Sequence, residues 1–127
     1  MIVLDASAAL SGLFNAGQAR RVLSVEQVHV PHLIDVEVAN ALRRMVNAGQ
    51  LGTDDGWAAL DTWRRLALTR HPADALLVRI WDLRENLSAY DASYVALAEG
   101  LGCHLVTADA RLSRAPGVGC PITVIPR

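Results

Sequence analysis

The chain has 127 residues and a mass of 13.7 kDa, which suits one domain with a single core. Its net charge of -1 excludes a strongly basic, histone-like protein that coats nucleic acid, although it allows a local basic patch. All twelve basic residues are arginine, so chemistry that needs a lysine ammonium, such as a Schiff base or a phosphate-loop lysine, is excluded.

The sequence predicts a cytoplasmic protein without a membrane segment. The longest uncharged run, residues 6–19, is too short and too polar to span a bilayer. Asp5 stands where a signal peptide would carry positive charge. Cys103 and Cys120 lack the paired spacing of a zinc site or a redox motif, so we expect reduced, partly buried thiols.

Short apolar runs alternate with helical periodicity through the first half of the chain. The expected elements are a strand at 2–4, a helix capped by Ser7 that ends near 15–17, a short helix at 19–23, a strand at 28–30 closed by Pro31, and a helix from Leu33 to a terminating turn at 47–49. The expected core stripe of that last helix is Val36, Ala39, Leu42, Met45 and Val46.

The second half continues this alternation. The expected elements are a helix capped by the hydroxyl of Thr53 that runs to Leu66, a strand at 66–69, a helix at 73–87, a helix at 91–101, and strands at 104–107 and 122–125. Short apolar strands that alternate with helices predict a three-layer α/β/α domain around a mainly parallel sheet. Nothing indicates a second domain within residues 1–127.

Four carboxylates lie where the ends of these strands would converge. Asp5 directly follows the first strand, and Asp109 follows the strand at 104–107. Glu37 lies in the first turns of the helix after the second strand, and Asp91 begins the helix that leads into the strand at 104–107. Because ligands of parallel sheets bind beyond the carboxyl ends of the strands, this edge is the candidate site.

Each acid alone has an ordinary alternative role. Asp91 and Asp109 could each cap a helix, and Glu37 could be a solvent-exposed helix charge. Asp5 is harder to explain in this way, because a carboxylate directly after a buried strand needs a partner. Together, four converging carboxylates repel one another unless a cation offsets them, and their hard oxygens favour Mg²⁺ or Mn²⁺ over zinc.

Four blocks of sequence, in this order, resemble the acidic motifs of PIN-domain nucleases, and most of all those of the VapC toxins of bacterial VapBC toxin–antitoxin pairs. The blocks are Ile2–Leu10 (IVLDASAAL), Pro31–Leu33 with Glu37–Leu42 (PHL and EVANAL), Tyr90–Ala98 (YDASYVALA) and Leu105–Leu112 (LVTADARL). The resemblance covers essentially the whole chain and implies a single PIN domain.

The resemblance implies an endoribonuclease that depends on Mg²⁺ or Mn²⁺ and cuts phosphodiesters with metal-activated water. Its catalytic and metal-ligating residues would be the acidic quartet, which is Asp5, Glu37, Asp91 and Asp109. Three polar residues match positions that family members place beside the quartet, namely Ser7, Asn40 and Thr107. Ala108 departs from the family pattern, because many relatives carry a polar residue there.

The resemblance also implies partners: an RNA substrate, a VapB-like antitoxin that occludes the acidic pocket, and a second copy of the chain in a homodimer or a larger complex. Arg43, Arg44 and Arg111 lie near the quartet in sequence and are candidates for substrate contact, although a solvated helix face explains them equally well. Trp57 or Trp63 could line a groove for a partner helix, or both could pack in the core.

Two rival functions require residues that the chain lacks, and two others stay open. A phosphoacceptor receiver domain needs a lysine, and a dinucleotide-binding domain needs a glycine-rich turn after the first strand; the chain has neither. A PIN nuclease of RNA processing without an antitoxin stays open, as does a PIN-like binding protein without catalysis. The residues do not identify the RNA that is cut, and they do not exclude DNA as a substrate.

Overall fold

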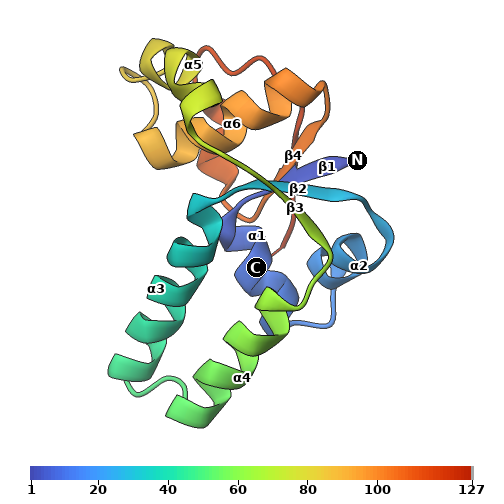
Figure 1. Cartoon of the computed structure of the whole chain (residues 1–127), viewed down its shortest axis with the longest axis vertical. Coiled ribbons are helices and arrows are strands. Elements are labelled where there is room, and N and C mark those ends of the chain that lie inside the picture. The colour runs from blue at the N-terminus through green and yellow to red at the C-terminus, as the bar shows by residue number, and fades with distance from the viewer. Residues whose placement is uncertain (127) are drawn as a thin grey trace.

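A five-stranded parallel sheet forms the centre of the molecule in a computed structural model, which describes residues 1–126 (Figure 1). The strand order is β3-β2-β1-β4-β5, and every neighbouring pair is parallel. The strands are β1 (Ile2–Leu4), β2 (Val28–Pro31), β3 (Leu68–His71), β4 (His104–Thr107) and β5 (Ile122–Val124). The expected strands are thus present, and the part of the sheet that is described is entirely parallel.

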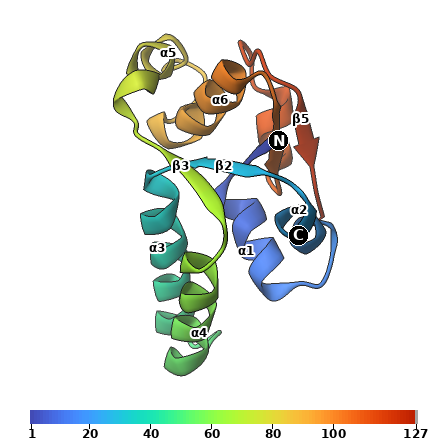
Figure 2. The same cartoon turned by 45° about the vertical axis from the view of Figure 1, so that its right-hand side comes forward.

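Helices cover both faces of the sheet, as Figures 1 and 2 show. One face carries α1 (Ala6–Phe14), α2 (Gln18–Val25), α3 (Leu33–Asn47) and α4 (Thr53–Arg64), and the other carries α5 (Leu77–Asp82) and α6 (Ala89–Leu101). Two short 3₁₀ helices, η1 (Asp74–Leu76) and η2 (Ala110–Arg114), precede α5 and follow β4. The three-layer α/β/α prediction is confirmed.

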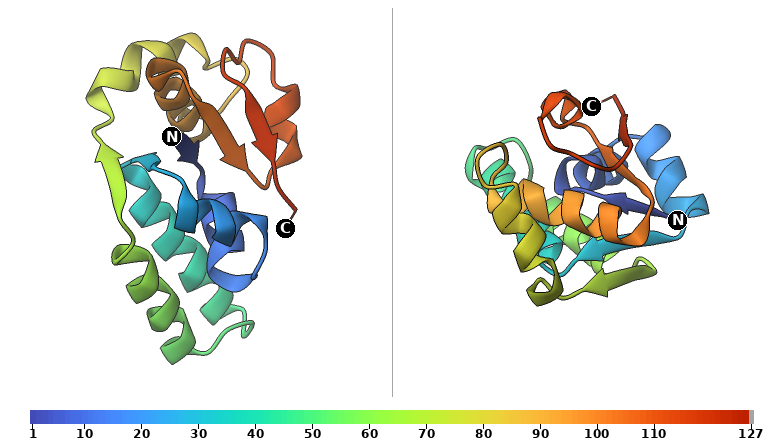
Figure 3. Two further views of the ribbon diagram at one scale, coloured as in Figure 1. Left: turned by 90° about the vertical axis from the view of Figure 1, so that its right-hand side faces the viewer. Right: turned by 90° about the horizontal axis from the view of Figure 1, so that it is seen from above.

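The core lies where β1 and β4 pass between the two helical layers. All residues of β1 are buried, and a continuous buried stretch of α6, residues 92–98, lies across the strands (Figure 3, right). This explains why the strands read as uninterrupted apolar runs, since a parallel sheet is covered on both faces. Within residues 1–126, no helix combines the length and hydropathy that a bilayer span requires.

Helix capping differs from the sequence prediction at two of the helix starts. Asp5, not Ser7, caps α1, because its carboxylate accepts a hydrogen bond from the Ala8 amide. The cap of α4 is Gly52 without a side-chain bond, and Thr53 is the first helical residue. Ser88 caps α6 by accepting a bond from the Asp91 amide, so Asp91 is free of the capping role that was its alternative explanation.

The core stripe of α3 is rotated relative to the prediction. Val36 is 73% exposed, and the buried positions are Ile34, Val38, Ala41 and Leu42. The two sets overlap only at Leu42 because the sequence offers apolar residues on more than one side of the helix. Packing against the sheet therefore selects the face that the helical period leaves ambiguous.

Two predicted boundaries between residues 66 and 87 were also wrong. The third strand begins at Leu68, two residues later than expected, because its register is set by pairing with Val28 of β2. The helix expected at 73–87 is interrupted: η1 is followed by α5, and the chain then turns so that Leu83 enters the core. Leu77, Val78 and Trp81 of α5 consequently face solvent.

Asp35 joins three elements on one side of the sheet. Its carboxylate, at the start of α3, accepts a hydrogen bond of 2.8 Å from the indole of Trp63 in α4. Arg70 of β3 adds two more, of 2.7 and 3.0 Å. Burial alone would raise the pKa of Asp35, but these hydrogen bonds lower it below its ordinary value. Trp63 therefore belongs to the core and not to a partner groove.

Two of the four histidines form a contact between neighbouring strands. His29 Nδ1 of β2 lies 2.8 Å from His71 Nε2 of β3, and His29 Nε2 is buried without a hydrogen-bond partner among the residues described. Burial, the charge of His71 and the N-terminal amine lower the pKa of His29. This histidine is therefore favoured in its neutral form.

We expect the folded protein to lose stability in mild acid because of the histidine pair. An unfolded histidine takes up a proton near pH 6.5, whereas folded His29 resists it, so the free energy of unfolding should fall as the pH drops through about 6.5. Urea unfolding at pH 7.5 and 5.5 should show a smaller pH-dependent loss in His29→Gln than in wild type. His104→Gln, at an exposed position, is the matched control and should keep the wild-type dependence. Equal dependence in all three proteins would contradict the prediction.

Candidate active site at the carboxyl edge of the sheet

The four acids of the sequence-predicted quartet line one cavity. Asp5 follows β1, Asp109 follows β4, and the neighbouring pairing of these strands brings the two residues to the same edge. Glu37 reaches the cavity from α3 and Asp91 from α6, on opposite faces of the sheet. The cavity has a volume of about 320 Å³. The predicted convergence of these residues from four distant segments is what the topology produces.

Asp5 is the most buried of the four, with 5% of its surface exposed. One carboxylate oxygen accepts hydrogen bonds from the Ala8 amide (3.0 Å) and the Ser7 hydroxyl (2.6 Å). The other accepts one from the Thr107 hydroxyl at the end of β4. The two hydroxyl residues predicted to lie beside the quartet therefore contact it directly and satisfy its most buried member.

The same hydroxyls also order the loop after β4. Ser7 accepts a hydrogen bond from the Ala108 amide (2.9 Å), and Thr107 accepts one from the Asp109 amide (3.0 Å). Only the backbone of residue 108 takes part in these bonds. An alanine therefore serves at position 108, because only its backbone is needed for this contact.

The electrostatics of the cavity disfavour full ionisation of the acids. Burial raises the pKa of Asp5, Glu37 and Asp91 above their ordinary values. Repulsion adds to this, because Asp91 and Asp5 raise the pKa of Glu37, while Asp5 and Asp109 raise that of Asp91. Added positive charge would therefore be stabilised in this cavity.

Arginines supply part of that charge. Arg111 makes a bidentate ion pair with Asp109, with distances of 2.7 Å from Nη2 to Oδ2 and 3.0 Å from Nε to Oδ1. Arg44 of α3 also lines the cavity, so two of the three candidate arginines lie at the site. The third, Arg43, lines a separate hollow between α3 and α4 together with Trp57.

Two further residues bear on the site prediction. Asn40, expected beside the quartet, is exposed and is not among the residues that line the cavity. Tyr94 was not singled out from the sequence, yet its hydroxyl donates a hydrogen bond of 2.5 Å to Glu37 Oε1 from within the cavity wall. The available signal was its position three residues after Asp91, which places both on one face of α6.

The donor set fits a hard divalent cation in chemical type. Four carboxylates face one cavity, and three of them carry pKa values raised by burial and by their acidic neighbours. Within residues 1–126, however, no three His, Cys, Asp or Glu side chains are close enough together to hold a metal ion as they stand. Binding of an ion would therefore require the carboxylates to rotate inward.

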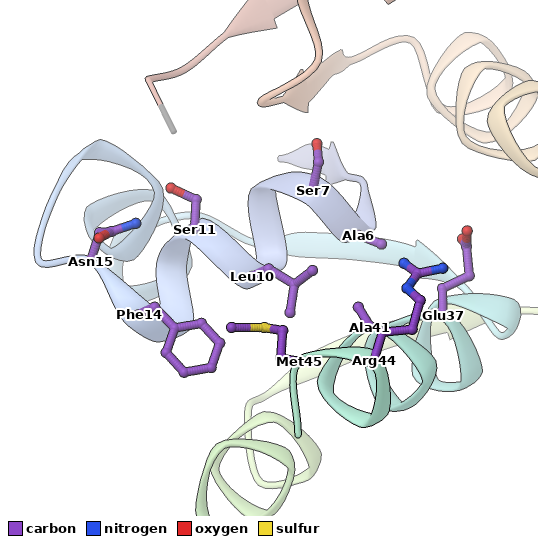
Figure 4. Close-up of a pocket in the computed structure, with 10 residues that line it drawn as sticks. All are labelled: Ala6, Ser7, Leu10, Ser11, Phe14, Asn15, Glu37, Ala41, Arg44 and Met45. Carbon is purple, nitrogen blue, oxygen red and sulfur yellow. The ribbon is translucent and has the colours of Figure 1, made fainter. Parts of the chain in front are cut away.

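An apolar groove opens from the cavity between α1 and α3 (Figure 4). It has a volume of about 480 Å³, and Leu10, Phe14 and Met45 point toward one another across it. Glu37 and Arg44 stand at the end that it shares with the acidic cavity. An apolar segment lying in this groove would reach the carboxylates.

Comparison with known proteins agrees with this architecture. Residues 2–118 match the family model described as PIN domain. Ribonuclease VapC9 of Mycobacterium tuberculosis is 61% identical over 127 residues, which is the full length of both chains. The similarity to this relative therefore extends over all 127 residues.

Solved structures share the fold. The crystal structure of PAE2754 from Pyrobaculum aerophilum has a TM-score of 0.70 and 26% identity, and the match covers 95% of this chain and 81% of that one. VapBC2 from Rickettsia felis, bound to a DNA fragment from its promoter, has a TM-score of 0.72 and 12% identity, covering 98% of both chains. The chain belongs to the PIN-domain family and, within it, to the VapC ribonucleases.

Proposed function

We propose that this protein is an endoribonuclease toxin that depends on Mg²⁺ or Mn²⁺ and is neutralised by a VapB-like antitoxin. The observation that carries the proposal is the convergence of Asp5, Glu37, Asp91 and Asp109 on one cavity. Membership of the VapC ribonucleases supports RNA as the substrate. A binding protein without catalysis is disfavoured, because all four acids are present and line one cavity.

The side chains around the cavity would have different roles in such a reaction. A bound divalent ion supplies Lewis-acid charge and lowers the pKa of water for attack on the phosphodiester. Asp5, Asp91 and Asp109 would hold this ion, and Glu37 would hold a second one or orient the attacking water. Arg44 and Arg111 both line the cavity with the acids and would bind the phosphate backbone.

The apolar groove between α1 and α3 is the proposed seat of the antitoxin. A partner segment with apolar side chains would pack on Leu10, Phe14 and Met45. A basic side chain at the end of that segment would meet the uncompensated acids of the cavity, so charge complementarity favours an antitoxin with this pattern. The segment would thereby cover the same carboxylates that the reaction needs.

The exposed apolar face of α5 is the proposed dimer surface. Val78 is 79% exposed and Trp81 is 67% exposed, with Leu77 beside them on the same short helix. Arg84 lies over the Trp81 ring, with Cζ 4.8 Å from the ring centroid, and Asp82 is the last residue of the helix. A second copy related by two-fold symmetry would therefore bring one positive and one negative side chain to the interface from each side. The face is separate from the groove, which allows both partners to bind at once.

Cleavage of purified RNA tests the proposed activity. Wild-type protein should cut total RNA with Mg²⁺ or Mn²⁺ and not with EDTA, leaving 5′-phosphate and 3′-hydroxyl ends because water is the nucleophile. Asp5→Asn should reduce the rate by about 100-fold or more, since it removes one charge from the ion's ligands. A cooperative unfolding transition of Asp5→Asn, even at lower stability than wild type, shows that the variant is folded. Metal-independent cutting, or 2′,3′-cyclic ends, would contradict the mechanism.

The Asp91→Asn variant tests whether Asp91 is needed for cleavage and not for folding. Asp91→Asn should abolish cleavage, yet leave the free energy of unfolding in EDTA at pH 7.5 unchanged or higher, because it relieves repulsion by Asp5 and Asp109. The folded pKa of Asp91 is raised, so any gain in stability should shrink as the pH falls toward about 4 and the wild-type carboxylate takes up its proton. Mg²⁺-dependent cutting by Asp91→Asn would disprove its assignment.

Light scattering after gel filtration tests the dimer surface. Val78→Arg buries a charge in the proposed interface and should shift the protein from twice the chain mass to the monomer mass of 13.7 kDa. Val25→Arg on α2 is the matched control, because Val25 is also highly exposed, and it should leave the dimer intact. A monomeric wild type, or a dimeric Val78→Arg, would contradict this surface.

A further inference from the structure

Tyr94 is the largest polar-tipped side chain that is fully buried next to the acidic cavity. Only 1% of its surface is exposed, and its ring packs in the core beneath α6. A phenylalanine would fill the same apolar space, so packing alone does not account for the hydroxyl. The hydroxyl makes one described contact, the hydrogen bond to Glu37 Oε1, which joins α6 to α3 across the site.

Among the residues described, Glu37 depends on a single hydrogen-bond donor, unlike Asp5 and Asp109. Asp5 is held by three donors, and Asp109 is held by Arg111 and by its own helix-capping bond. For Glu37, the Tyr94 hydroxyl is the one hydrogen-bond donor within residues 1–126. A glutamate also has one more rotatable bond than an aspartate, so it loses more conformational entropy when it is fixed.

The hydrogen bond selects one orientation of the Glu37 carboxylate. Tyrosine is protonated at neutral pH, since its ordinary pKa is about 10, and a protonated phenol donates to the carboxylate. Oε1 accepts this bond, whereas no described hydrogen bond reaches Oε2. The carboxylate lines the cavity with Asp5, Asp91 and Asp109, so Oε2 keeps both lone pairs for an ion or a water molecule.

We propose that Tyr94 is a positioning residue that holds the Glu37 carboxylate at the cavity wall, where it would bind a divalent ion or its water. This inference rests on the proposed metal-dependent function. The role is indirect, because Tyr94 acts through Glu37 and needs no contact with RNA. It resembles the way in which residues behind a metal ligand set the ligand's orientation.

Calorimetric titration of the full chain with Mn²⁺ tests the proposal without relying on activity. Tyr94→Phe removes only the hydroxyl and should weaken Mn²⁺ binding by about 10-fold. It should also lower kcat for RNA while leaving KM nearly unchanged, because substrate contacts are untouched. Tyr90→Phe is the matched control, since Tyr90 lies on the same helix but is exposed, and it should bind Mn²⁺ as the wild type does.

A double-variant cycle distinguishes positioning from a general structural effect. If Tyr94 acts through Glu37, Tyr94→Phe combined with Glu37→Gln should bind Mn²⁺ no more weakly than Glu37→Gln alone. Additive losses, or wild-type Mn²⁺ affinity in Tyr94→Phe, would overturn the proposal. Wild-type protein that binds no Mn²⁺ would overturn the proposed function as well, so the two failures are distinguishable. Unfolding curves in EDTA show whether each variant is folded.

Discussion

The fold and the site both depend on a carboxylate that is buried at the end of the central strand. A charged group in this position is costly unless each oxygen finds donors. Asp5 finds them in its own helix start and in two hydroxyls, one of which belongs to β4. Because the same hydroxyls bind the backbone of the loop after β4, satisfying Asp5 also fixes where Asp109 emerges. The same two hydroxyls thus satisfy the buried Asp5 carboxylate and position the loop that carries Asp109.

The other two acids of the cavity come from the two helical layers. Glu37 comes from one face of the sheet and Asp91 from the other, and both line the cavity beyond the strand ends. Burial and the charges of neighbouring acids raise the pKa of each of them. Arg111 pairs with Asp109 but leaves the other three acids without a matching cation among the described ion pairs. Such unfavourable charge is typical of functional sites, where local stability is given up for binding.

The sequence predicts the parallel sheet and the convergence of the four acids well, because both follow from the order of short apolar runs and helices. Asp5 directly follows such a run and Asp109 lies two residues after another, and parallel pairing brings these strand ends together. The exposed face of α5 and the buried face of α3 are harder to predict, because apolar residues occur on several sides of each segment and tertiary packing makes the choice. The role of Tyr94 was missed for a similar reason: its partner lies 57 residues away, and no local pattern indicates the hydrogen bond.

The groove and the acidic cavity have four wall residues in common, which are Ala6, Ser7, Glu37 and Arg44. Two ligands that each need these atoms cannot be bound together, so a segment filling the groove to this end and a phosphodiester at the acids compete directly. Competition of this kind needs no change in the shape of the protein. The relative concentrations and affinities of the two ligands would therefore decide which of them is bound.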